Sequence, residues 1–143
     1  MNTRTTGRAL LALGCLLVWP GMADETAVSR IEAGRAAYDQ GDFAAAAEAF
    51  AAAVALVPDD DVAVYWLGKA YGRQAERAGW FEAMRLARLT RQSLERAVAL
   101  NPENPEAVRD LARYYDEAPG FLGGDAARAA ELRARLSRLP RTR

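Results

Sequence analysis

The sequence predicts an all-α fold in which about three helix-turn-helix repeats stack into a solenoid. Three prolines, Pro58, Pro102 and Pro140, each close an apolar stretch, and proline cannot continue a helix. Small residues precede each proline, and two of them, Gly34 and Gly68, lie 34 residues apart. Alanine makes up much of the 51% hydrophobic content, which favours helices that pack closely. A fixed period of this length is typical of stacked helical hairpins.

The prolines and the turn residues between them predict six helices. A glycine marks the turn between the two helices in each of the first two hairpins. Gln40-Gly41-Asp42 separates the first two helices, and Gly79 separates the third from the fourth. Asn104 followed by proline begins the fifth helix, and Asp125 is placed to cap the sixth after a loop at 118–124. We expect helices at 25–40, 42–56, 60–78, 80–100, 104–117 and 125–138.

The second repeat is longer than the first. From Gly68 to Gly79 there are 11 residues against 7 in the first repeat, and from Gly79 to Pro102 there are 23 against 17. At 3.6 residues per turn, the first helix of this hairpin gains about one turn and the second gains one to two. The corner at Gly79-Trp80-Phe81 should therefore protrude beyond its neighbours.

The repeats carry a recognisable family pattern. The second repeat reads Leu67-Gly68-x2-Tyr71, and the first reads Ala46-x3-Phe50. The chain thus resembles the tetratricopeptide-repeat (TPR) family, with TPR-like repeats at about 27–60, 61–104 and 105–140. The resemblance is strongest in the first repeat and weakest in the third.

The N-terminus is predicted to be a signal peptide. Arg4 and Arg8 precede an apolar stretch at 9–19, and Gly21-Met22-Ala23 supplies the small residues of a cleavage site. We expect cleavage after Ala23, so that 1–23 is removed, 24–143 is the mature domain, and the protein is periplasmic or secreted. An uncleaved anchor and lipid modification at Cys15 are the alternatives, and the second is disfavoured because the apolar run continues beyond Cys15.

The TPR resemblance implies that the first helix of each repeat lines a concave face that binds an extended peptide or a partner helix. One of the positions that match this face is basic in all three repeats, and several others are basic or aromatic, which suits an acidic or carboxylate-bearing peptide. Alternatively, the arginines are solvated, or they pair with Asp39, Asp116 and Glu117 within one helical turn. The candidate groove residues are Arg35, Tyr38, Tyr65, Lys69, Arg73, Arg109 and Arg113.

A second candidate surface is the corner at Trp80. Trp80 occupies the place of Asp42 in the first repeat, a helix start that is normally exposed, so an exposed indole that meets a partner or another copy is expected. Phe81 corresponds to Phe43 and should pack back between the helices. Either the lengthened second repeat or another molecule covers the apolar side of the last helix, which leaves homo-oligomerisation open.

Catalysis and nucleic-acid binding are disfavoured. Histidine is absent, Cys15 is the only cysteine, and no phosphate-binding loop or calcium-loop spacing occurs, so no catalytic, metal or cofactor site is predicted. Formal charge is zero, and removing Arg4 and Arg8 leaves 17 basic against 19 acidic residues. We predict a non-catalytic protein–protein interaction module of the cell envelope. The alternative is a self-associating or membrane-surface structural protein.

Overall fold

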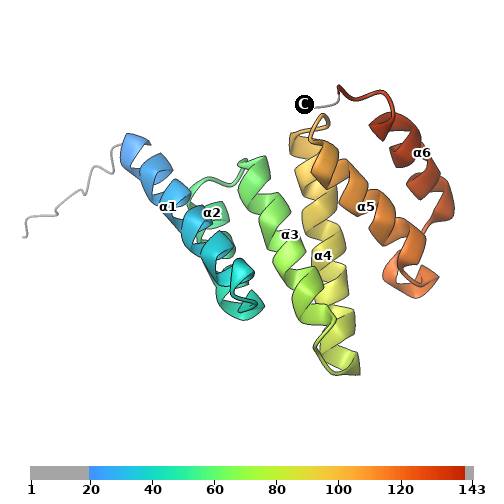
Figure 1. Cartoon of the computed structure of the whole chain (residues 1–143), viewed down its shortest axis with the longest axis horizontal. Helices are drawn as coiled ribbons and strands as arrows, with labels where there is room; N and C mark the ends of the chain where they lie inside the picture. The colour runs from blue at the N-terminus through green and yellow to red at the C-terminus, as the bar shows by residue number, and fades with distance from the viewer. Residues whose placement is uncertain (1–19, 141–143) are drawn as a thin grey trace, which may run out of the picture.

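The computed structural model of the protein describes residues 20–140, which form an all-helical chain without a strand (Figure 1). The helices form consecutive antiparallel hairpins, and the packing of α2 on α3 and of α4 on α5 joins one hairpin to the next. The predicted all-α solenoid is therefore confirmed. The elements are α1 (Pro20–Asp39), α2 (Phe43–Leu56), α3 (Asp61–Ala75), α4 (Trp80–Leu100), α5 (Pro105–Glu117), the short 3-10 helix η1 (Gly120–Leu122) and α6 (Ala126–Leu136).

Most of the helices start at a side-chain cap. Asp42 accepts a hydrogen bond from the Ala45 backbone N–H at 3.0 Å, and Asp60, Asn104 and Asp125 each accept two such bonds. These bonds satisfy backbone donors that have no partner within the helix. The predicted starts at Asn104 and Asp125 are confirmed.

Three predicted helix boundaries differ from the structure by two or more residues, and one of them is the end of the sixth helix, at Leu136 instead of 138. The first helix begins at Pro20 instead of residue 25, because proline at the first helical position loses no hydrogen bond and its backbone is already helical. The cleavage point expected after Ala23 therefore lies in the first turn of α1, while residues 1–19, with Cys15, lie outside the described part. The third helix ends at Ala75 instead of 78, where i→i+3 bonds such as Arg77 N–H to the Gln74 carbonyl tighten the chain into the corner.

The core is built around small residues that let helices approach closely. A Cβ added at Gly34 would lie 2.6 Å from the ring of Phe50, which is fully buried. Phe50 packs with Ala46, Ala47 and Ala70 in a cluster that joins the first hairpin to α3.

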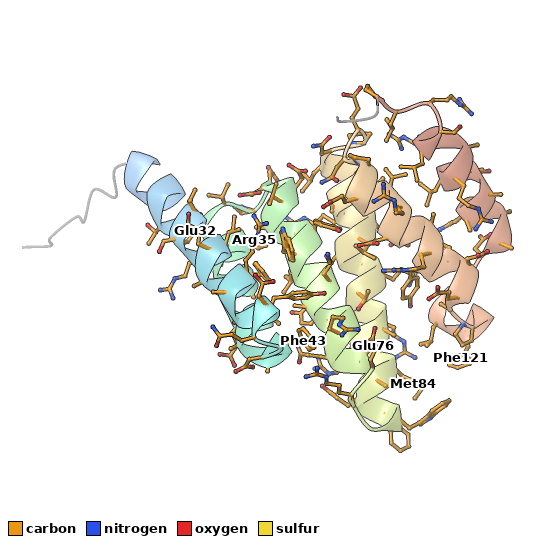
Figure 2. All side chains as sticks on the ribbon, viewed as in Figure 1. Glu32, Arg35, Phe43, Glu76, Met84 and Phe121 are labelled. Carbon is orange, nitrogen blue, oxygen red and sulfur yellow. The ribbon has the colours of Figure 1, made fainter. Side chains whose placement is uncertain are left out.

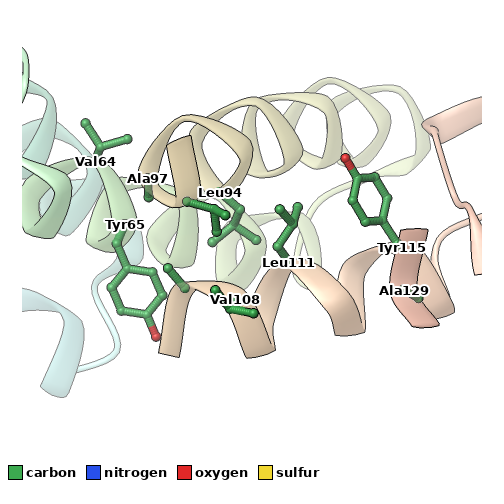
Figure 3. Close-up of a cluster of buried hydrophobic side chains, with 10 residues drawn as sticks. Val64, Tyr65, Leu94, Ala97, Val108, Leu111, Tyr115 and Ala129 are labelled. Carbon is green, nitrogen blue, oxygen red and sulfur yellow. The ribbon is translucent and has the colours of Figure 1, made fainter. Parts of the chain in front are cut away.

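A second cluster joins the other two hairpins. It includes Val64, Leu94, Val108 and Leu111, as Figure 3 shows. The apolar residues of the last helical segment (Leu132, Leu136 and Leu139) pack against this cluster. The chain thus covers, at least in part, the apolar side of α6 by itself.

The lengthening predicted for the second hairpin is confirmed for α4 but not for α3, which has 15 residues against 20 in α1. α4 has 21 residues against 14 in α2 and 11 in α6, so it exceeds α2 by about two turns. Figure 1 shows the α3–α4 corner extending beyond the other corners. No helix within residues 20–140 is long and apolar enough to cross a bilayer.

The loop between α5 and α6 is well ordered by hydrogen bonds. The Tyr114 hydroxyl donates to the Leu122 carbonyl at 3.0 Å, and the Gly124 N–H donates to the Pro119 carbonyl at 3.1 Å. Gly123 has a φ of 92°, a left-handed conformation that favours glycine. A Cβ at Gly124 would lie 1.7 Å from the Ala118 carbonyl oxygen, so both glycines are needed for this turn.

Candidate ligand groove

The first helices of the hairpins, α1, α3 and α5, surround a groove of about 930 Å³. Gly68 and Gly72 of α3 have no side chain to fill it, so Thr90 and Leu94 of α4 reach its floor. Its charged and aromatic walls are Tyr38, Asp39, Phe43, Lys69, Arg73, Glu76, Arg77, Asp110, Arg113, Tyr114 and Glu117. Of the predicted groove residues, Tyr38, Lys69, Arg73 and Arg113 are thus brought together on one surface.

Lys69 is held over aromatic rings in this groove. Its ammonium nitrogen lies 4.5 Å from the ring centroid of Trp66, 5.4 Å from that of Tyr65 and 5.6 Å from that of Tyr38. Within residues 20–140, no carboxylate forms an ion pair with it. The rings fix the ammonium group by cation–π attraction but leave its positive charge uncompensated.

Arg35 approaches the same indole from α1. Its guanidinium carbon lies 4.9 Å from the Trp66 centroid, and Figure 2 shows Arg35 between α1 and α3. Arg35 is exposed, and it too has no carboxylate partner among the described residues. Arg35 and Lys69 therefore place two uncompensated cations at Trp66. We call this the Trp66 cation pair.

Asp110 organises the opposite wall. One of its carboxylate oxygens accepts from the Tyr65 hydroxyl at 2.9 Å, and the other accepts from Arg113 at 3.2 Å. The Tyr65 ring is only 3% exposed, so Tyr65 belongs to the core and supports Lys69 and Asp110 from behind. Only the Asp110 side chain fixes Arg113 within the described chain.

Two predicted cations are paired within one helical turn. Arg73 pairs with Glu76, and Arg113 pairs with Asp110, rather than with Asp39, Asp116 or Glu117. The Arg73–Glu76 pair is exposed on both sides, and such pairs are worth about 0–1 kcal/mol, so a ligand can compete for Arg73. In the other pair only Arg113 is exposed, because the Asp110 side chain is 15% exposed. The groove as a whole is mixed in charge. Of the four cations that line it, Lys69 and Arg77 have no carboxylate partner among residues 20–140, and Arg35 adds a third unpaired cation beside Lys69 at Trp66.

Four predicted binding residues do not line the cavity: Arg35 and Tyr65, which lie behind or beside Lys69 at the Trp66 ring, and Arg109 and Trp80. Arg109 is exposed on α5 but does not line the cavity, because the side chain that faces the cavity is that of Asp110. Trp80 is 68% exposed at the α3–α4 corner. The expectation that Phe81 packs between helices was wrong, since Phe81 is 82% exposed and Leu86, more than one turn later, is the first buried residue of α4.

Sequence reasoning missed two residues that line the groove, Asp110 and Arg77, and one that supports Lys69 beside it, Trp66. Trp66 was noted only as a residue out of register, and Asp110 was not considered, although it lies three positions before Arg113 on the same helix face. Arg77 belongs to the surplus turn of the second repeat. It donates to the Gly41 carbonyl at 3.0 Å, and its guanidinium carbon lies 4.5 Å from the Phe43 centroid.

The groove tyrosines give the protein a predictable sensitivity to alkaline pH. Burial raises the pKa of Tyr38, Tyr65 and Tyr114, and the Asp110 charge and its hydrogen bond raise the pKa of Tyr65 further. Because the unfolded-state pKa is about 10, this contribution to stability is complete below pH 10 and is lost as the pH rises through the higher folded-state values. We expect the urea midpoint to fall above about pH 10.

Tyr65→Phe is the control for this alkaline effect. Urea unfolding followed by circular dichroism, at a series of pH values, should show a smaller alkaline decline in this variant. An equal decline in both proteins would mean that Tyr65 does not contribute.

No cluster of three or more metal-binding side chains occurs within residues 20–140. The groove has aromatic rings that face cations, paired and unpaired charged side chains, and a floor that glycines leave open. These features suit the non-covalent binding of a polypeptide segment.

Stacked helical hairpins with a groove along their first helices define the class of helical-repeat interaction proteins. A family model described as TPR repeat matches residues 34–74, which span the end of α1, α2 and nearly all of α3. Residues 34–74 are thus similar to the tetratricopeptide-repeat family, and the all-helical hairpins of residues 20–140 agree with a TPR-like solenoid. TPR repeats generally mediate protein–protein interaction. No curated protein matches the chain.

Proposed function

We propose that this protein is a non-catalytic interaction module that binds an acidic segment of a partner protein in its concave groove. The observation that carries the proposal is the Trp66 cation pair, in which Arg35 and Lys69 lie 4.9 Å and 4.5 Å from one indole ring. A carboxylate of the ligand would supply the charge that both cations lack.

The balance of charges along the groove limits how acidic the ligand can be. Four basic residues (Lys69, Arg73, Arg77, Arg113) and four acidic residues (Asp39, Glu76, Asp110, Glu117) line the cavity. A long polyacidic run would be repelled by the acidic members. We therefore propose a segment with one acidic anchor residue at the Trp66 cation pair.

We place this activity in the cell envelope, on the basis of the apolar stretch at 9–19 and the small residues before Asp24. Cleavage after Ala23 would remove only the first turn of α1 and would leave every groove residue in place. The exported protein should then begin at Asp24 on N-terminal sequencing. An N-terminus at Met1 in the envelope fraction would contradict this processing.

Selection from a random peptide library tests the ligand class. The protein, immobilised away from the groove, should enrich peptides that carry an acidic residue at a fixed position beside apolar residues. Their affinity should fall as salt rises, because exposed charges are screened. Enrichment of peptides without an acidic residue, or binding that is independent of salt, would refute an acidic ligand.

A further inference from the structure

Three aromatic side chains at the corner end of the molecule are exposed although they belong to ordered elements. Trp80 and Phe81, the first two residues of α4, are 68% and 82% exposed, and Phe121 of η1 is 62% exposed. None of them lines the ligand groove.

The loop that carries Phe121 lies against α4. A Cβ at Gly123 would be 2.9 Å from Nε of Arg91, so the loop backbone rests on this arginine. The hydrogen bonds that Tyr114 and Gly124 make across the loop fix its shape. The hydrogen bonds of the loop and its contact with Arg91 therefore hold Phe121 in an exposed position.

Arg91 lies on the same face of α4 as the corner tryptophan. Positions 80, 84, 88 and 91 are spaced by three or four residues, which aligns them along one side of a helix. Met84 and Arg88 thus lie between the corner and the loop, and Figure 2 shows Met84 and Phe121 toward the same lower end of the molecule. We call Trp80, Phe81, Met84, Arg88 and Phe121 the aromatic strip.

The strip carries a positive charge. Arg88 is exposed and has no ion-pair partner in the described part of the chain. Glu82, the acidic residue of the first turn of α4, is paired with Arg85 at 2.5 Å. The free charge beside the aromatic rings is therefore that of a cation.

We propose that the aromatic strip docks on the surface of an anionic lipid bilayer. Tryptophan and phenylalanine rings favour the membrane–water interface, and an unpaired arginine beside them is attracted to lipid phosphates. The strip lies on the protruding α3–α4 corner and the neighbouring loop (Figure 1), a convex shape that meets a flat surface without needing a complementary pocket. Docking there leaves the ligand groove free, so the two activities are separate.

Vesicle sedimentation of the full chain tests this proposal. Vesicles of phosphatidylcholine, with and without phosphatidylglycerol, are compared for the wild type, for Trp80→Ser/Phe81→Ser, and for the control Val28→Ser/Leu56→Ser. The control removes two other exposed apolar side chains, 55% and 41% exposed. The apolar stretch at 9–19 is present in every protein, so only differences between the variants report on the strip.

The corner variant should bind vesicles that contain phosphatidylglycerol about tenfold more weakly, while the control remains unchanged. Arg88→Gln should weaken binding about fivefold on these vesicles and have no effect on neutral ones. Equal binding of the corner variant and the control would overturn the proposal. Corner-dependent self-association without lipid, measured by size-exclusion chromatography with light scattering, would also overturn it, because a second copy would then be the occupant.

Discussion

Replacement of Phe50 by alanine is expected to lower the free energy of unfolding by about 3–5 kcal/mol, a large part of the total stability of a small domain. Phe50 is fully buried, and its ring lies over Gly34 of α1 and stacks on Trp66 of α3 at 5.8 Å. Three helices therefore meet at this one side chain. The other buried residues of its cluster are alanines, whose short side chains cannot move to fill the cavity.

Urea unfolding followed by circular dichroism measures this effect, with Phe121→Ala as the matched control. Phe121 is 62% exposed, so its loss should change the free energy of unfolding by less than about 0.5 kcal/mol. Gly34→Ala alone should cost about 1–3 kcal/mol, because its methyl group meets the Phe50 ring. In the Phe50→Ala background that cost should largely disappear. Additive effects of the two substitutions would contradict the close contact between Gly34 and Phe50.

The helices were predictable because their signals are local. A proline, a capping residue such as Asn104 or Asp125, and a turn glycine each set the conformation of only the few residues next to them. Five of the six helices accordingly begin within one residue of the expected position. The length of α4 also followed from residue spacing alone. The start of α1 at Pro20 was missed because the first helix was predicted to begin after the expected cleavage site at Ala23.

The predictions about the site that were wrong concern side chains whose surroundings come from residues distant in the sequence. Phe81 corresponds to the buried Phe43, yet the α3–α4 corner extends past the hairpins that would have covered it. Arg109 was assigned to the groove and Asp110 was not, because a shift of one residue turns a helix by about 100° and exchanges the residue that faces inward. The hydrogen bond from Arg77 to the Gly41 carbonyl joins residues 36 positions apart, and no pattern near either residue indicates it.

The charge balance of the groove was partly visible in the sequence. Arg73 and Glu76, and likewise Asp110 and Arg113, are three residues apart, a spacing that favours pairing on one helix. The Trp66 cation pair was not visible, since it unites side chains of α1 and α3 around an indole that the repeat pattern does not expect at that position.

The largest effect on binding is expected from Lys69→Glu. Reversal of this charge places a carboxylate beside the acidic anchor residue of the ligand, in a site walled by three aromatic rings where solvent screening is reduced. Affinity for a library-selected acidic peptide should fall by about 100-fold or more. Lys69→Gln, which removes the charge without reversing it, should cost about tenfold.

Arg109→Glu is the matched control for this charge reversal. Arg109 is likewise a cation on a groove-forming helix, but it is exposed and does not line the cavity, whereas Lys69 is half-buried. Reversal of the Arg109 charge should change the affinity by less than about twofold, apart from the weak long-range effect of net charge. Circular dichroism and thermal unfolding of each variant establish that the fold is retained.

The most direct test of the acidic-ligand groove is a charge-swap titration by isothermal calorimetry. The selected peptide and a copy with lysine at the acidic anchor are each titrated into the wild type, Lys69→Glu and Arg109→Glu. We predict that the acidic peptide binds the wild type and Arg109→Glu but not Lys69→Glu, and that the lysine peptide prefers Lys69→Glu to the wild type. Equal affinity of the acidic peptide for the wild type and Lys69→Glu would contradict the proposed function.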